Sequence, residues 1–264
     1  MNSFLNKFSA FLVKDLKIAL SYKFNLFIQL VMFLFIFITI YFAFQNPDLD
    51  NSNLSYFDIF LSLLSIDFMF SSLNIFSREV RLAKTAGTFE TNLLTNTSFL
   101  TIIFSSYAVT FLRMMLRAFL YLLVCKFFFN FNLSLTQIFI VIISLYYNSV
   151  PFIALGLISA SFIIVYKAGD ITNFVISLLS IFFSGIFFPV SSLPSYMKSF
   201  GEVTPLNICL ETSKKIIQDN FNFVDLLPYF KLTTVEIIIF LPIGLFFISK
   251  ALKLAKKEGT LSYY

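Results

Sequence analysis

Long apolar runs separated by short polar segments constrain this chain more than any other feature of its sequence. A helix needs about 20 apolar residues to cross the hydrocarbon core of a bilayer. Runs of this kind recur along the chain, and we predict six crossings: Phe24–Phe44, Tyr56–Ser77, Tyr107–Phe129, Leu135–Tyr166, Ile171–Pro189 and Leu232–Lys250. The polar segments between them are too short for a separate soluble domain. The predicted fold is an all-α, multi-pass membrane protein with one transmembrane domain over residues 1–264.

Composition supports the membrane class and argues against catalysis by this chain. Hydrophobic residues make up 58% of the sequence and charged residues 12%, whereas about 25% of residues are charged in a soluble domain. The chain has no histidine, the commonest metal ligand and general base. Its two cysteines, Cys125 and Cys209, do not have a metal or redox spacing. We therefore expect no catalytic residue and no metal site.

The first 23 residues predict an amphipathic helix that lies in the membrane interface. Phe4, Phe8 and Leu16 belong to its apolar face, while Lys7 and Lys17 lie mostly away from that face. A solvated leader is the alternative. The following run, Phe24–Phe44, is longer than the apolar region of a signal peptide and has no cleavage site after it. We interpret it as a retained first span.

The lysines and arginines between the predicted spans are divided unequally between the two sides. Twelve lie on the side of the termini and five on the other. The twelve are Lys7, Lys14, Lys17, Lys23, Arg78, Arg81, Lys84, Lys167, Lys250, Lys253, Lys256 and Lys257, and the five are Lys126, Lys198, Lys214, Lys215 and Lys231. Because cytoplasmic loops carry the excess of positive charge, both termini are predicted to be cytoplasmic in a cell membrane, plasma or inner.

The segment Ser184–Pro205 interrupts the fifth apolar run. Gly185, Pro189 and Pro194 break the helix, since proline lacks a backbone donor and disfavours helical geometry in the residue before it. The residues that follow are amphipathic and too polar to cross the membrane. We predict a re-entrant segment over 184–220 at the outer surface. Irregular backbone at membrane depth is tolerated only inside protein or beside water, so this segment is a candidate passage or lid.

The longest predicted cytoplasmic loop covers residues 78–97. Residues 78–84 suit a short helix along the membrane surface, and Gly87 interrupts it. Thr88 can cap the next turn, with Glu90 near its N-terminus, where a carboxylate is favoured. Phe89, Leu93 and Leu94 would form an exposed apolar edge. Such an edge is typical of a docking surface for a soluble partner, but an interfacial anchor explains the spacing equally well.

Three ionisable residues interrupt the apolar runs: Asp67, Arg113 and Arg117. Each costs about 2.5–3.5 kcal/mol at the centre of a span. Arg113 and Arg117 are four residues apart and share a helix face, so we predict that Asp67 pairs with one of them. Arg113 could instead extend to the cytoplasmic head groups, or both arginines could line a path for an anionic head group. Glu236 is interpreted as wet, near the outer interface.

Two segments carry a family resemblance, AGTFETNLLTNTS at residues 86–98 and SGIFFPVSSLP at residues 184–194. The first, through Gly87, Thr88, Phe89 and Glu90, resembles a motif between the second and third spans of ABC-2 type transporter permeases. The second, followed by Pro205, resembles the family's SGxFFPxxxLP…P signature. Asn96-Thr97 departs from the Thr-Pro pair common in the family. The six spans and the amphipathic N-terminal helix are also similar, so the resemblance covers nearly the whole chain.

The resemblance implies a membrane subunit that works with a separate ATPase. Two permease copies, identical or different, would form a dimer, and residues 78–90 would be the coupling helix, with Arg78 and Arg81 at its start. Residues 190–220 would be outer re-entrant helices. The gate residues would be Gly185, Phe188, Pro189, Pro194 and Pro205. The chain has no G-x-x-x-x-G-K-[ST] phosphate loop, so ATP and Mg would be bound by the partner and no cofactor by this chain.

The function expected from the resemblance is export by efflux, without an enzyme activity in this chain. The cargo would be a hydrophobic, amphipathic or lipid-linked substrate such as a drug, lipid or natural product. No nucleic acid is expected as a partner. Export of polysaccharides or lipid-linked glycans is the alternative, although that branch usually has a Trp-containing lead into its first span and this chain has no Trp. A membrane enzyme or an assembly subunit is a further alternative from another class.

Overall fold

The computed structural model describes residues 2–21, 23–44, 56–89, 99–128, 133–166, 169–217 and 222–258, and every regular element in these ranges is helical. The predicted all-α class is therefore confirmed. The α-helices are α1 (Asn2–Ser21), α2 (Lys23–Phe44), α3 (Tyr56–Thr85), α5 (Phe99–Phe128), α6 (Leu135–Tyr166), α7 (Gly169–Phe183), α8 (Ser195–Val203), α9 (Pro205–Ile217) and α10 (Leu227–Glu258). Two short 3-10 turns cover Val190–Ser192 and Phe223–Leu226.

Four helical segments are long and apolar enough to cross a membrane: Phe57–Thr85, Ser105–Phe127, Leu135–Tyr166 and Phe223–Ala255. Two shorter apolar stretches, Phe27–Thr39 in α2 and Ile171–Phe183 in α7, coincide with the other two predicted crossings. The membrane class agrees with this pattern, and the count of six crossings stays a prediction.

Helix α3 corrects the prediction for the cytoplasmic loop. It continues without a break from Tyr56 to Thr85, so residues 78–84 are its last two turns and not a separate helix along the membrane surface. The reason is local, because arginine, leucine, alanine and lysine are strong helix formers and residues 78–84 contain neither glycine nor proline. Helix α5 likewise starts at Phe99, before the predicted span.

Helix α6 is the centre of the bundle and contacts α3, α7, α9 and α10. Two glycines let its backbone approach its neighbours closely. A Cβ added at Gly156 would lie 2.6 Å from the backbone oxygen of Leu73 on α3, and one added at Gly244 of α10 would lie 2.6 Å from that of Ala154. Small residues of this kind are typical of helix contacts in membranes.

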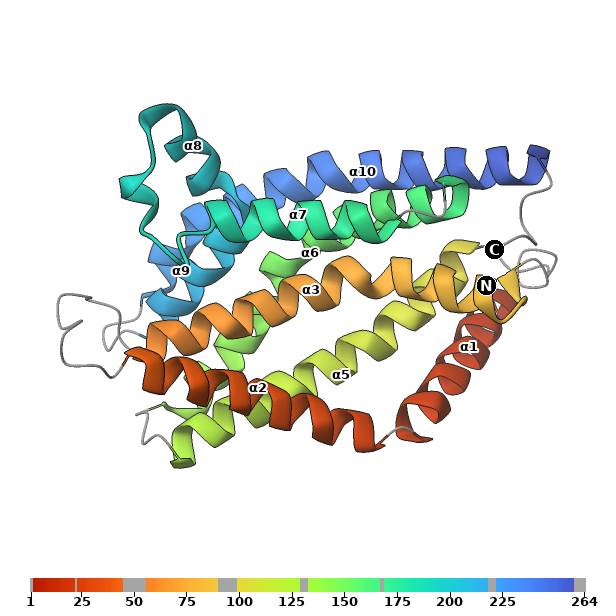
Figure 1. Ribbon diagram of the computed structural model, residues 1–264. Coiled ribbons are helices and arrows are strands. Elements are labelled where there is room, and N and C mark those ends of the chain that lie inside the picture. The colour runs from red at the N-terminus through yellow and green to blue at the C-terminus, as the bar shows by residue number, and fades with distance from the viewer. Residues whose placement is uncertain are drawn as a thin grey trace.

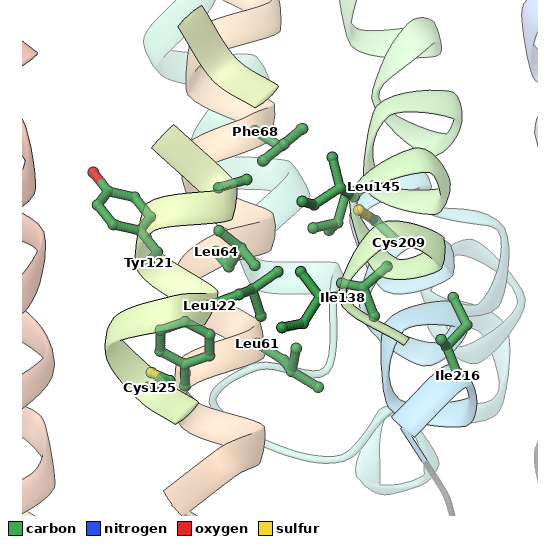
Figure 2. Close-up of a cluster of buried hydrophobic side chains, with 14 of the residues drawn as sticks. Leu61, Leu64, Phe68, Tyr121, Leu122, Cys125, Ile138, Leu145, Cys209 and Ile216 are labelled. Carbon is green, nitrogen blue, oxygen red and sulfur yellow. The ribbon is translucent and has the colours of Figure 1, made fainter. Parts of the chain in front are cut away.

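The largest apolar core lies between α3, α5, α6 and α9 (Figure 2). Leu61, Leu64 and Phe68 of α3 face Ile138 and Leu145 of α6 in this cluster. Leu122 of α5 and Cys209 and Ile216 of α9 complete it. Helix α9 is thus part of the core, and its residues 206–210 are all buried.

The two ends of the bundle carry different elements (Figure 1). Helices α8 and α9 lie at one end. The C-terminal ends of α3 and α10 and the N-terminal end of α1 lie at the other. The predicted coupling segment and the predicted outer segment are therefore at opposite ends of the bundle. Helix α1 packs against α5, and its position in the membrane interface stays a prediction.

Candidate functional site

An ion pair joins two helices in the middle of the apolar region. Arg117 Nη2 of α5 lies 2.7 Å from Asp67 Oδ2 of α3. The predicted pairing of Asp67 is therefore present, with Arg117 as the arginine involved. The side chain of Arg117 is 13% exposed and that of Asp67 is 25% exposed. Because the two charges attract each other, the pair offsets part of the free energy needed to bury each charge in an apolar layer.

Arg117 also donates hydrogen bonds to uncharged partners. Its Nη1 donates a hydrogen bond to Gln29 Oε1 of α2 at 2.9 Å, and its Nη2 donates to Ser71 Oγ of α3 at 2.6 Å. The Tyr121 hydroxyl donates to the main-chain oxygen of Gln29 at 3.3 Å. One guanidinium thus connects α2, α3 and α5. Sequence reasoning missed Gln29 and Ser71, because uncharged polar residues occur throughout the apolar runs.

Arg113 lies one turn before Arg117 on α5. Its Nη2 donates a long hydrogen bond of 3.4 Å to Thr110 of the same helix, and its side chain is partly buried. A role for either arginine toward an anionic head group stays a prediction.

The end of α3 forms a helix-terminating turn around Gly87. Gly87 has φ +66°, its N–H donates to Lys84 O at 3.0 Å, and Thr88 N–H donates to Ala83 O at 2.9 Å. This pair of bonds is the Schellman arrangement, which places a left-handed residue, usually glycine, just after the helix. The Thr88 hydroxyl also donates to Ala83 O, at 3.3 Å. The prediction that Gly87 interrupts this segment is confirmed.

Lys84 holds this turn against the end of α6. Its side chain is buried, and Nζ donates to Ile163 O at 3.2 Å and to Ile164 O at 3.0 Å. The last four carbonyls of a helix have no partner within the helix, and a cation is favoured beside them. Lys84 therefore joins the C-terminal ends of α3 and α6. From the sequence, Lys84 was used only as one of the positive charges that predict membrane orientation, because nothing in the sequence shows that α6 ends beside it.

Phe89 corrects a second expectation for this loop. Its side chain is only 2% exposed and belongs to a core cluster with Val80, Ile163 and Ile164, so it cannot form an exposed apolar edge. The Lys84 Nζ lies 5.7 Å from the centre of its ring. The exposed residues here include Arg78 and Leu82 in the last two turns of α3, and Thr85 and Thr88 in the Gly87 turn. Glu90, Leu93 and Leu94 lie outside the described residues.

Replacing Lys84 by methionine should destabilise the chain by about 1–3 kcal/mol, because two buried carbonyls lose their charged donor. The exposed Lys253 of α10 is a matched control, and its replacement by methionine should change stability by less than about 0.5 kcal/mol. Thermal unfolding of the purified protein in detergent measures both. Equal effects at the two positions would contradict the role assigned to Lys84.

The predicted outer segment is divided into short pieces by the residues that the sequence singled out. Helix α7 ends at Phe183, and Gly185 has φ +76°. Pro189 and Pro194 directly precede the 3-10 turn and α8, and Pro205 is the first residue of α9. Proline is favoured at a first helical position because no donor is needed there. The predicted break is confirmed, and the gating role of Gly185, Phe188 and the prolines stays a prediction.

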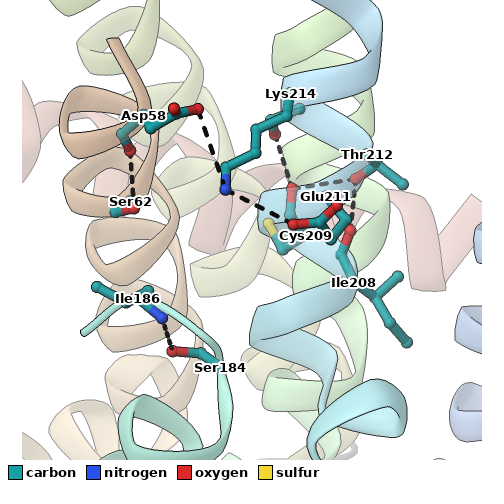
Figure 3. Close-up of polar contacts among 10 residues, drawn as sticks. Asp58, Ser62, Ser184, Ile186, Ile208, Cys209, Glu211, Thr212 and Lys214 are labelled. Atoms are coloured by element: carbon teal, nitrogen blue, oxygen red, sulfur yellow. Dashed lines mark hydrogen bonds and ion pairs between the residues drawn. The ribbon is translucent and has the colours of Figure 1, made fainter. Parts of the chain in front are cut away.

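Polar contacts fix α9 between α3, α6 and α10. Asn148 Nδ2 of α6 donates to Thr212 Oγ1 of α9 at 2.7 Å, and Thr233 Oγ1 of α10 donates to Asn148 Oδ1 at 2.8 Å. Lys214 lies 4.0 Å from Asp58 of α3 and 3.6 Å from Glu211 (Figure 3). Lys214 therefore links α9 to α3.

No group of three or more His, Cys, Asp or Glu in the described residues is arranged to hold a metal ion. The candidate site in these ranges has three parts. Arg117 joins α2, α3 and α5 near the middle of the apolar region, the Gly87 turn is held to α6 at one end of the bundle, and the short helices after α7 lie at the other end.

Comparison with known families assigns the chain to one of them. The sequence matches the family model described as ABC-2 type transporter over residues 7–217, and no curated protein matches it. The matched range contains the ion pair, the Gly87 turn and α9. Since it covers most of the chain, the protein belongs to the ABC-2 type transporter family.

Proposed function

We propose that this chain is the transmembrane permease subunit of an ATP-binding cassette exporter. Membership of the family makes it a component of a membrane transporter. The observation that supports the exporter proposal is the turn from Lys84 to Phe89. This turn has solvent-exposed residues on one side and a buried connection to α6 on the other. A segment of this kind can receive a push from a soluble partner and transmit it to the bundle.

The partner is a separate ATPase that docks on the exposed side of this turn. Arg78 and Leu82 lie on that side, and Leu82 is 50% exposed. Closure of the ATPase around ATP and Mg displaces the end of α3. Because Lys84 holds this end to α6, and α6 contacts α9 and α10, the displacement reaches the outer end as a rigid-body movement.

The pathway forms in a dimer of two permease copies, identical or different, in a cell membrane with both termini in the cytoplasm. The excess of lysine and arginine on the side of the Gly87 turn supports this orientation. The cargo is hydrophobic, amphipathic or lipid-linked. Export of a drug, lipid or natural product is favoured over glycan export by the absence of Trp before the first span.

The permease purified by affinity from its native membrane should carry its ATPase with it, measured as vanadate-sensitive ATP hydrolysis. Negative charges introduced at the exposed end of α3 should remove this activity. The double variant Arg78→Glu/Leu82→Glu should lower the retained activity at least tenfold, about 1.4 kcal/mol of binding. The variant Lys198→Glu, on exposed α8, reverses one charge at the opposite end and should retain wild-type activity. Equal retention by both variants would contradict docking at the turn.

A further inference from the structure

Glu236 is a carboxyl group buried in the middle of a membrane helix. It lies three residues before Ile239, the midpoint of the apolar stretch Phe223–Ala255, and is 5% exposed. The interpretation of Glu236 as a wet interfacial residue is therefore wrong. Thr233, one turn earlier on α10, is fully buried and bonded to Asn148 of α6. Gly244, two turns later, packs on the α6 backbone, so Glu236 belongs to the face that α10 turns toward α6.

The Glu236 carboxyl has no partner in the described part of the chain. Its Oε2 is buried without a hydrogen bond, and no ion pair includes it. This is the reverse of Asp67, whose charge is balanced by Arg117 at 2.7 Å.

The neighbouring elements offer no charge to balance it. Helix α6 contains no Asp, Glu, Lys or Arg between Leu135 and Tyr166, and its titratable groups are tyrosines. The Tyr147 hydroxyl bonds with that of Thr234 at 2.7 Å. On α9, Lys214 contacts Asp58 and Glu211, and Lys215 lies over the Tyr229 ring. Asp225, in the 3-10 turn before α10, and Lys231, on α10 itself, are both exposed.

We propose that Glu236 is a proton-binding site that is occupied in this conformation. An ionised carboxylate without a partner in an apolar interior costs several kcal/mol, and the neutral acid avoids that cost. The bound proton does not depend on the proposed export cycle.

Difference infrared spectroscopy of the purified permease at pH 7.5 tests the proton directly. Wild type should show the carbonyl stretching band of a protonated carboxylic acid, and Glu236→Gln should lose it. Asp67→Asn should keep that band and lose a carboxylate band instead. Glu236→Asp, which retains the acid, should keep a shifted band and serves as the second variant if glutamine impairs folding.

The result that would overturn the proposal is the loss of a carboxylate band, and not of an acid band, on replacing Glu236. The measurement uses the permease alone, so it does not depend on the ATPase. If the ATPase is not captured but the acid band is present, the proposed function is rejected and the proton site stands. If the ATPase is captured but the acid band is absent, the proton site is rejected and the proposed function stands.

Discussion

Replacing Arg117 by methionine is expected to destabilise the bundle by about 3–5 kcal/mol, the usual cost of removing one partner from a buried ion pair. Methionine fills much of the same volume, so packing is largely retained. Asp67 loses the cation 2.7 Å away, and Gln29 and Ser71 lose their hydrogen-bond donor. The effect should be large because the uncompensated carboxylate is in an apolar layer. Thermal unfolding in detergent at neutral pH is the measurement.

The double variant Asp67→Asn/Arg117→Met is the control for charge. It removes both charges, so it should recover a large part of the stability lost by Arg117→Met alone, because unpaired charge is the main penalty. A double variant no more stable than Arg117→Met would show that the ion pair is not the source of the effect.

The apolar runs predicted which parts of the chain are helical but not where each helix ends. Hydropathy changes at the membrane surface, whereas a helix continues as long as its residues favour it. Helix α3 therefore continues to Thr85, where the sequence predicted a surface helix. Helix breaks at glycine and proline follow from the covalent structure of these residues and do not depend on distant contacts. They were accordingly predictable at Gly87, Gly185 and Pro194.

The same distinction separates the site residues that could be predicted from those that could not. Asp67 and Arg117 stood out because a charge in an apolar run needs an explanation. Lys84 and Phe89 did not, because their roles depend on the end of α6, a helix distant in sequence. Glu236 was placed too near the surface because the helix that carries it begins at Leu227 and not at Leu232.

Polar contacts from three helices converge on α6. Lys84 holds the end of α3 to the C-terminal carbonyls of α6, and Asn148, near the middle of α6, joins it to α9 and α10. A movement of α6 must therefore strain or break polar contacts with all three helices. Its close backbone contact with α3 at Gly156 determines how much of such a movement the two helices share.

Replacing Gly156 by alanine should destabilise the protein by about 1–3 kcal/mol, the usual effect of overpacking. In an unobstructed helix the same change would stabilise by about 0.5–1 kcal/mol. The sign reverses here because the new Cβ would lie 2.6 Å from Leu73 O and 3.3 Å from Leu73 Cα. These are backbone atoms, which cannot rotate away, so α3 and α6 must separate. Thermal unfolding of Gly156→Ala measures the loss.

The control is to shorten the Leu73 side chain in the same protein. Since the clash is with the Leu73 backbone, Gly156→Ala/Leu73→Ala should be no more stable than Gly156→Ala, and less stable by the cost of the cavity, about 2–5 kcal/mol. Recovery of stability in the double variant would mean that the two helices meet through side chains. In that case α3 could slide along α6, and a displacement at the Gly87 turn would not have to move α6 with it.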